Sequence, residues 1–303
     1  MRIGIFTGDV GTGDVDGYIA AARTAHEQGF ANYWVPQVFS HDALTILALI
    51  GREVPGIELG TSVVPTYPRH PMVLAGQALT TNAAAGGRLV LGIGLSHQVV
   101  IEGMWGYSFD KPARHMREYL NALMPLLRGE AISYQGETLT ARGGLAVPGS
   151  SPMPVVLAAL APRMLELAGS VADGTLTWCT GPATLESHVI PSINAAAEKA
   201  GRDAVPRVIA GLPVCVTDDK AAARERIAKS LAIYPTLPSY KAMLDKEGVE
   251  SPADIGLLGS EDEVRDGIAR LEKIGVTDLA AAEAAADPDE RERTRAALVA
   301  ALS

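Results

Sequence analysis

The side chains best suited to proton transfer follow apolar runs of the kind that form buried strands. His97 stands at the end of one such run, and Tyr67 follows another. A histidine has an unperturbed pKa near neutrality, so His97 could donate a proton to a substrate or hydrogen-bond a cofactor. The competing interpretation is that His97 caps a helix or supports its neighbours. Arg69 and His70 immediately precede an expected helix and can simply brace its start, so Tyr67 is the better candidate for a ligand contact.

Phosphate binding is suggested by the segment Leu160-Ala161-Pro162-Arg163-Met164. Proline is favoured at the first position of a helix, and a helix that begins at Pro162 would leave the amides of Arg163 and Met164 unpaired. These amides and the Arg163 guanidinium would together attract a phosphate group. Proline also begins helices in proteins of every fold, so the pattern alone favours a structural interpretation.

Aromatic residues gather in two further places, although they make up only 5% of the chain. Trp105, Tyr107 and Phe109 follow the run that contains His97, and Trp178 precedes Thr180-Gly181-Pro182. Such gathering is typical of an apolar binding wall. Packing beneath a long loop would explain it nearly as well.

Short runs rich in β-branched residues precede these candidates, and the runs alternate with longer segments of helical period. This alternation is typical of parallel strands joined by crossover helices. The first unit is a strand at Arg2 to Phe6, a loop at Gly8 to Gly13 and a helix at Asp14 to Gln28 that Gly29 ends. Further strands are expected at Asn32 to Pro36, Ile57 to Val64, Arg88 to Gly94, Val155 to Ala159, Thr175 to Cys179 and Arg207 to Val216.

Helical signals lie between these strands. Helices are expected at Asp42 to Glu53, Pro71 to Ala84, Lys111 to Leu127, Pro162 to Ala172, Pro182 to Ala200 and Lys220 to Ile233. Ser260-Glu261-Asp262-Glu263 is a capping box that begins one more helix. Thr277 to Ala281 therefore falls in the place of the eighth strand, although propensity alone would make this alanine-rich run helical.

The element order predicts an α/β fold, a (β/α)8 TIM barrel in a single domain over residues 1–303. Two insertions interrupt the repeat. Ile132 to Thr140 alternates like a small hairpin before the fifth strand, and Pro235 to Ser260 lengthens the seventh crossover. An open doubly wound sheet is the alternative, but no Gly-x-Gly-x-x-Gly follows the first strand. The carboxyl ends of barrel strands face the active site, and the candidates above lie there.

Composition excludes several classes of partner. Lys and Arg total 26 against 35 Asp and Glu, a formal charge of -9, and no basic stripe could follow nucleic acid. No apolar run is long enough for a signal peptide or a membrane span, so we expect a cytoplasmic protein with no membrane partner. Cys179 and Cys215 have no Cys or His at ligand spacing, so we expect core thiols and no metal site. A small-molecule substrate is the expected partner.

Two segments carry a resemblance to a known family. They are Gly60-Thr61-Ser62-Val63-Val64-Pro65-Thr66-Tyr67-Pro68-Arg69-His70-Pro71 and Arg88-Leu89-Val90-Leu91-Gly92-Ile93-Gly94-Leu95-Ser96-His97. Together they resemble the bacterial-luciferase-like superfamily, and within it the oxidoreductases that use coenzyme F420, especially an actinobacterial group with the same Pro-Thr-Tyr-Pro-Arg-His-Pro phrase. The likeness covers nearly the whole chain, through Leu157-Ala158-Ala159-Leu160-Ala161-Pro162-Arg163-Met164, Ala172-Asp173-Gly174 and Gly275-Val276-Thr277-Asp278.

The resemblance implies a barrel that holds a deazaflavin at its carboxyl mouth. In similar enzymes the pair that matches Ser62 and Val63 forms a non-prolyl cis peptide that backs the cofactor ring, whereas the letters alone fit an ordinary buried strand equally well. Leu95 and Ser96 match positions whose backbone touches the cofactor in relatives, and Gly94 before them allows close backbone approach. The cofactor phosphate of the family matches the place of Leu160, Ala161, Arg163 and Met164. The clustering of aromatic residues, rather than the resemblance, suggests that Trp105, Tyr107 and Trp178 line the substrate pocket.

One departure from the family pattern bears on the substrate. The F420-dependent sugar-phosphate dehydrogenases of this superfamily carry an Asp-His pair after the second strand and a glutamate after the fourth. This chain has Gln37-Val38 and His97 in those places. A more apolar substrate than a sugar phosphate therefore fits better.

Three functions remain open on this basis. The first is an F420-dependent oxidoreductase that transfers a hydride, with His97 or Tyr67 supplying a proton. The second is an FMN-dependent monooxygenase like the luciferases, and the third is a noncatalytic flavin-binding barrel. The resemblance also implies a homodimer, and the expected helix Asp42 to Glu53 is apolar enough around its circumference to join its interface, unless it is a core helix.

Overall fold

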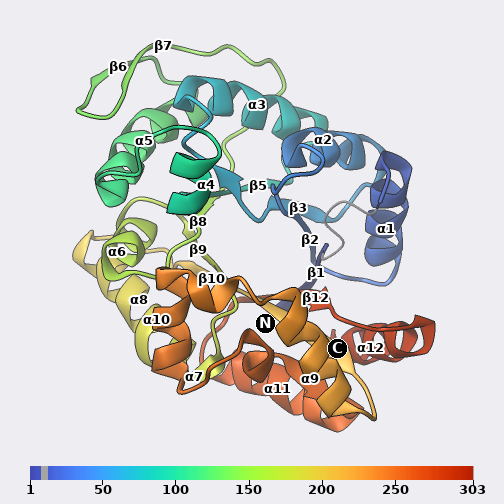
Figure 1. Ribbon diagram of the computed structural model, residues 1–303. Coiled ribbons are helices and arrows are strands. Elements are labelled where there is room, and N and C mark those ends of the chain that lie inside the picture. Colours follow the sequence, from blue (N-terminus) through green and yellow to red (C-terminus); the bar gives the residue numbers. More distant parts are fainter. Residues whose placement is uncertain (8–12, 303) are drawn as a thin grey trace.

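A closed ring of parallel strands forms the centre of the protein, and helices surround it (Figure 1). The computed structural model describes residues 1–7 and 13–302. Neighbours in the ring follow the order β10, β12, β1, β2, β3, β5, β8 and β9, and β9 pairs with β10 to close it. The strands of the ring are β1 (Arg2–Phe6), β2 (Asn32–Val35), β3 (Glu58–Thr61) continued by β4 (Val64–Pro65), β5 (Leu89–Gly94), β8 (Val155–Leu157), β9 (Gly174–Trp178), β10 (Arg207–Val216) and β12 (Asp278–Glu283).

The predicted (β/α)8 barrel is thus confirmed, including the strand that propensity disfavoured. Asp278–Glu283 pairs in parallel with β1 on one side and β10 on the other. Leu279, Ala280 and Ala281 are fully buried there. Pairing with a strand on each side outweighs the helical preference of the alanine residues.

Most of the chain outside the ring is helical. The α-helices are α1 (Val15–Glu27), α2 (Ala43–Glu53), α3 (Pro71–Ala84), α4 (Gln98–Gly103), α5 (Pro112–Leu127), α6 (Pro162–Ser170), α7 (Pro182–Thr184), α8 (Ile190–Lys199), α9 (Lys220–Ser230), α10 (Pro238–Glu247), α11 (Glu261–Lys273) and α12 (Pro288–Ala300). Asp14 and Asp42 accept hydrogen bonds from the amides that begin α1 and α2, and Ser260 and Glu263 form the predicted capping box of α11.

The two predicted insertions have different structures. The first is the expected hairpin, in which β6 (Ile132–Gln135) pairs antiparallel with β7 (Thr140–Gly143). The second contains more than a long loop: a 3-10 turn (Tyr234–Thr236), α10, another 3-10 turn (Pro252–Ile255) and β11 (Leu257–Gly259), which pairs with the end of β10.

Several predicted boundaries were wrong. The third strand does not run unbroken from Ile57 to Val64, because residues 62–63 interrupt it between β3 and β4. The helix expected to reach Ile233 ends at Ser230, and the one expected to reach Ala172 ends at Ser170. The sequence also gave no signal for α4 or α12. Apart from Gly13, the expected loop at residues 8–13 lies outside the described residues.

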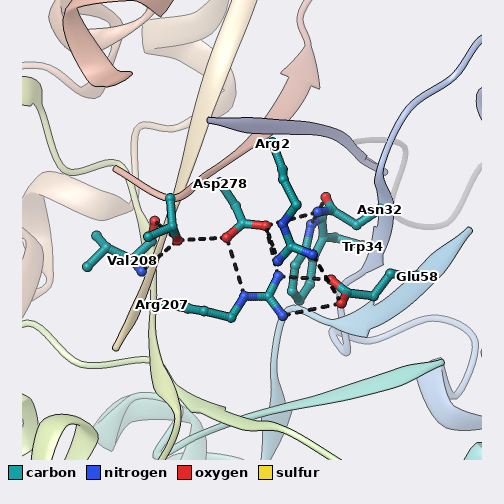
Figure 2. Close-up of polar contacts among 8 residues, drawn as sticks. Arg2, Asn32, Trp34, Glu58, Arg207, Val208 and Asp278 are labelled. Atoms are coloured by element: carbon teal, nitrogen blue, oxygen red, sulfur yellow. Dashed lines mark hydrogen bonds and ion pairs between the residues drawn. The ribbon is translucent and has the colours of Figure 1, made fainter. Parts of the chain in front are cut away.

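The amino ends of the strands are joined by a network of charged and polar groups (Figure 2). Asp278, which is fully buried, accepts from Arg207 at 2.8 Å and from Asn32 at 3.1 Å, and also pairs with Arg2. Arg207 bonds Glu58 as well, at 2.9 Å. The five residues begin or lie at the start of five different strands, so the network ties the bottom of the ring together.

Two of the three clusters of buried apolar residues in the described chain form most of the core. One fills the space between the strands and the helices. The other lies inside the ring and consists of Phe6, Trp34, Val90, Val156, Leu176, Ile209, Ala280 and Ala282, with Val63 and Trp178 packed against it. Phe6, Val63 and Trp178 lie at or just beyond the carboxyl ends of their strands, so the floor of the mouth is apolar. Both cysteines are free and buried, as expected of core thiols.

Candidate active site

The break between β3 and β4 forms a bulge at the mouth of the barrel. The peptide bond between Ser62 and Val63 is cis, as the resemblance implied. β5 accommodates the bulge because it has glycine where any side chain would collide. A Cβ on Gly94 would lie 2.7 Å from Val63 Cγ2, and one on Gly92 would lie 2.0 Å from the Thr61 carbonyl oxygen. Gly94 thus makes room for the chain's own bulge.

The carboxyl end of β5 turns sharply before α4. Ser96 has a left-handed backbone (φ 59°), which is uncommon for a residue with a side chain and is enriched at functional sites. His97 occupies the N-cap position of α4, but its side chain makes no capping hydrogen bond. Burial lowers the pKa of His97 below its ordinary value of 6.5, so the imidazole is neutral at neutral pH. The side chain therefore remains available for a ligand.

The junction between β8 and α6 differs from the prediction in one respect. Arg163 is exposed, and it makes no ion pair with the residues that the structure describes. The amide of Met164 was expected to be unpaired, and that prediction was wrong. Met164 N donates to the Ala161 carbonyl at 2.9 Å, because the first turn of α6 is tightened. The positive groups left for an anion are the Arg163 guanidinium and the start of the helix.

The loop that precedes α6 is held from two sides. The hydroxyl of Thr175 on β9 donates to the Leu157 carbonyl at 2.9 Å, and His188 Nε2 donates to the Leu160 carbonyl at 2.9 Å. His188 lies in a π-helical turn (Leu185–Val189), a rare element that often marks functional sites. Together these contacts fix the backbone of residues 158–161.

The ring of Tyr67 stacks on two other aromatic rings. It stacks on His115 with a centroid distance of 4.0 Å and on Phe109 at 5.4 Å. Burial, with Asp110 and Glu102 nearby, raises the pKa of Tyr67 to about 12. The phenol therefore stays protonated and can act as a hydrogen-bond donor.

The two neighbours of Tyr67 have the structural roles that the sequence suggested. Arg69 pairs with Asp42 at 2.8 Å, and the ring of His70 accepts from the amide of Met72 at the start of α3. Gln37 is also occupied, since its side-chain oxygen accepts from the amide of Ala43. These contacts leave Tyr67 as the ligand candidate in this group.

The predicted aromatic group is only partly brought together. Trp178 stacks on Phe6 at 4.9 Å, with an interplanar angle of 12°. Trp105 and Tyr107 lie after α4, where Tyr107 is 48% exposed, and within the described chain neither ring contacts Trp178. Besides Phe6, the ring that reaches Trp178 comes from a 3-10 turn that sequence reasoning missed. Tyr234 lies edge-on to Trp178 at 6.4 Å.

Three buried polar atoms without a partner gather in the predicted site. They are Ser62 Oγ, Tyr67 Oη and Trp178 Nε1, and in the described residues the one further such atom belongs to Gln77. A buried polar atom without a hydrogen bond costs about 1–3 kcal/mol, so three at one end of a barrel indicate that a polar ligand completes them. A flavin-type ring, which carries carbonyl oxygens and ring nitrogens beside an apolar face, fits this donor set and the apolar floor.

Other parts of the described chain offer no competing centre of this kind. No group of three or more His, Cys, Asp and Glu side chains there is arranged to hold a metal ion. Two surface hollows, one between α1 and α12 and one beside Met124 and Arg202, contain none of the predicted site residues. None of the described helices combines the length and the apolar character that crossing a membrane requires.

Comparison with protein families and curated proteins gives consistent results. The model of the luciferase-like monooxygenase family matches residues 1–278. The 5,10-methylenetetrahydromethanopterin reductase of Methanolobus tindarius is 31% identical over 239 residues, which cover 78% of this chain and 72% of that protein. A Mycobacterium tuberculosis protein named as a coenzyme F420-dependent oxidoreductase is 27% identical, over 93% of this chain and 84% of that protein.

Solved structures share the fold at lower sequence identity. The coenzyme F420-dependent tetrahydromethanopterin reductase of Methanopyrus kandleri has a TM-score of 0.78 at 22% identity, and the match covers 98% of this chain and 96% of that one. The oxygenating part of 3,6-diketocamphane monooxygenase from Pseudomonas putida, solved with FMN, has a TM-score of 0.75 at 19% identity, over 99% and 96%. The barrel alone therefore does not distinguish the two cofactors.

Proposed function

Because the chain belongs to the luciferase-like monooxygenase family, we propose that it is an F420-dependent oxidoreductase acting on a small, fairly apolar organic molecule. The observation that carries this proposal is the meeting of the Ser62–Val63 bulge with the partnerless atoms of Ser62, Tyr67 and Trp178 at one mouth. Relatives whose names state F420 dependence or a reductase activity support the choice of cofactor.

The cofactor would contact the chain at two places. Ser62 and Val63, with the backbone of Gly94, Leu95 and Ser96, would support the ring. The phosphate would lie beside Leu160 and Ala161, at the start of α6. Arg163, which forms no ion pair with the described residues, would bind it, and Met164 in the same first turn would lie beside it. When bound, the deazaflavin supplies a carbon centre that accepts or gives a hydride.

The protein's own contribution to the reaction is proton transfer and orientation. His97 is neutral at neutral pH because burial lowers its pKa, so it can accept the proton of an alcohol during oxidation. Once protonated, the same nitrogen can return that proton during reduction of a carbonyl. Tyr67, which keeps its proton because its pKa is raised to about 12, would hold the substrate or cofactor oxygen by a hydrogen bond.

An FMN-dependent monooxygenase is the second candidate, and the Pseudomonas putida structure with FMN on the same barrel favours it. Either cofactor has a flat ring and a phosphate, so both fit the bulge and the start of α6. Their reactions with oxygen distinguish them, since reduced FMN reacts with oxygen whereas a hydride-transferring deazaflavin enzyme requires an organic acceptor.

Parallel titrations of the purified protein with F420 and FMN, followed by absorbance, test the proposal. We expect F420 to bind at least about tenfold more tightly, and tight binding of FMN without binding of F420 would favour the monooxygenase. Arg163→Ala should weaken F420 by roughly tenfold through the lost phosphate contact. Arg270→Ala, an exposed arginine on α11, is the matched control and should change the affinity less than twofold.

We also propose that residues 1–303 form a single luciferase-like domain that assembles as a homodimer through α2. In α2, Leu44, Leu47 and Ile50 are buried against the core, whereas Leu49 is 41% exposed. Val73 on the adjacent α3 is 55% exposed, so the two helices present an apolar surface together. A solution mass equal to one chain would contradict the dimer, and Leu49→Glu with Val73→Glu should give that mass.

A further inference from the structure

A row of aromatic rings crosses the mouth of the barrel. It starts at Phe6 and Trp178, continues to Tyr234 at 6.4 Å and from there to Tyr240 at 4.7 Å, and ends at His97, 5.7 Å from Tyr240. Phe6 and Trp178 are the last residues of β1 and β9, and His97 follows β5. Both tyrosines come from the segment that lengthens the seventh crossover. That segment therefore reaches across the mouth and touches the proposed proton carrier.

The segment that carries the tyrosines is fixed to the barrel by a carboxylate. Glu247, the last residue of α10, accepts from the amides of Ala183 at 3.0 Å and Thr184 at 2.7 Å. The Thr184 hydroxyl in turn donates to the Met243 carbonyl at 3.3 Å. α10 is thus docked on the junction that directly follows Trp178, and this contact sets the distance between the tyrosines and the barrel.

Among the described residues, no charged side chain is one of the groups that shift the pKa of the two tyrosines. Burial raises the pKa of both phenols, and the other groups that raise it are the Cys179 thiol and, for Tyr240, Tyr234. On the opposite side of the mouth, Tyr67 is influenced by the carboxylates of Asp110 and Glu102. In the part of the chain that the structure describes, a charged substrate would find no counter-charge beside Tyr234 and Tyr240. A flat aromatic molecule can stack on such rings or meet them edge-on.

We propose that Tyr234 and Tyr240 are specificity-determining residues, which form the substrate-facing wall of the mouth and select flat, conjugated, uncharged molecules. Aromatic rings gain most from flat partners that can stack or meet them edge-on, whereas a globular molecule of the same mass touches each ring over a smaller area. Tyr234 packs on Trp178 and Tyr240 packs on His97, so a molecule bound at the mouth contacts these rings. This inference rests on the proposed function for the identity of the reaction, but the wall itself needs no cofactor.

Calorimetric titration with two probes of similar mass tests the proposal. Coumarin is a flat, conjugated carbonyl compound, and camphor is a globular, saturated one. We expect the protein, with or without F420, to bind coumarin at least about fivefold more tightly than camphor. Tyr240→Ala and Tyr234→Ala should each reduce that preference by roughly two- to tenfold, while Tyr240→Phe should keep it because the ring remains.

A matched control variant distinguishes a specific role of Tyr234 and Tyr240 from a general loss of structure. Tyr134→Ala removes a tyrosine from the hairpin strand β6 and should leave the ratio of the two affinities unchanged. Equal or tighter binding of camphor, no binding of either probe, or an unchanged ratio in both alanine variants would each overturn the proposal. F420 affinity is measured on the same samples. Loss of F420 binding with a preserved preference for coumarin would contradict the proposed function and leave the wall in place.

Discussion

Single residues at the mouth have steric requirements that can be tested without a substrate. Gly94→Ala would place a Cβ 2.7 Å from Val63 Cγ2 and 3.1 Å from Ala158 Cβ, so the bulge or the neighbouring strand must shift. We expect the free energy of unfolding to fall by about 1–3 kcal/mol, and cofactor binding to weaken with it. Urea unfolding and an F420 titration measure the two effects.

The matched control for this change is Gly76→Ala on α3. A Cβ there has no heavy atom within 4 Å, and alanine is the better helix former. Unfolding should therefore require about 0.5–1 kcal/mol more in that variant. If Gly94→Ala were as stable as Gly76→Ala, the packing of the bulge against β5 would be wrong.

His115 gives the protein a pH dependence of known direction. Burial lowers its pKa from 6.5 to about 4, although Glu118 opposes the shift. The unfolded chain therefore takes up a proton at His115 below about pH 6.5, whereas the folded chain does so only near pH 4. Folding stability is lost as the pH falls through this window, by roughly 2 kcal/mol after allowance for solvent screening.

Two measurements check the His115 prediction. The ring signals of His115 in NMR spectra should titrate well below pH 6.5 in the folded protein. In His115→Gln the decrease of unfolding free energy between pH 6.5 and 4 should be smaller than in the natural chain by roughly the same 2 kcal/mol. A midpoint at or above 6.5 would contradict the burial of this ring beneath Tyr67.

At the level of residues, sequence reasoning located the mouth but not all of its contacts. Ser62, Tyr67 and Trp178 were found because motif and strand position pointed to them, and the structure leaves a polar atom of each without a partner. The Met164 amide was misjudged, since a tightened first turn cannot be read from Pro162 alone. Tyr234, Tyr240 and His115 were missed because their contacts are with residues far away in the chain.

The position of α10 depends on the carboxylate of Glu247 at its end. Glu247→Gln keeps the size of the side chain but removes the charge that accepts from Ala183 and Thr184. Charge-assisted hydrogen bonds contribute roughly twice as much as neutral ones, so local opening of the segment should become about tenfold more frequent. Hydrogen exchange of residues 234–247 should accelerate accordingly, while exchange in α11 should not change. Equal rates in both proteins would show that Glu247 does not hold the segment.

Elements with a repeating pattern were predictable, and elements without one were not. β1 and β10 have the predicted bounds, and α3 does too, because apolar runs and a proline at the helix start mark them clearly. The β-branched residues of this segment predicted one unbroken strand, so the break at Ser62–Val63 could not be predicted from them. Only the family resemblance implied the cis peptide there. α10 and β11 lie in an insertion, where no barrel period constrains the interpretation.

The ring as a whole is closed at its amino end by the network around Asp278. Arg207→Met would leave this fully buried carboxylate without one of its two guanidinium partners, and the unfolding free energy should fall by roughly 3 kcal/mol. Arg265→Met, which breaks an exposed pair with Asp262 on α11, should cost less than about 0.5 kcal/mol. Urea unfolding of both variants measures the difference. F420 affinity should stay within twofold in each, because the network lies at the end opposite to the mouth; a large loss would contradict that separation.

The division of the barrel into a stabilising amino end and a ligand-binding carboxyl end is most directly tested by a crystal structure of the protein with F420. The deazaflavin ring should lie against Ser62 and Val63, and its phosphate should contact Arg163 at the start of α6. Ser62 Oγ, Tyr67 Oη and Trp178 Nε1 should then have partners in the ligand, in its substrate or in ordered water. A complex in which F420 binds away from this mouth, or in which these three atoms stay unpaired beside a bound ring, would contradict the proposed site.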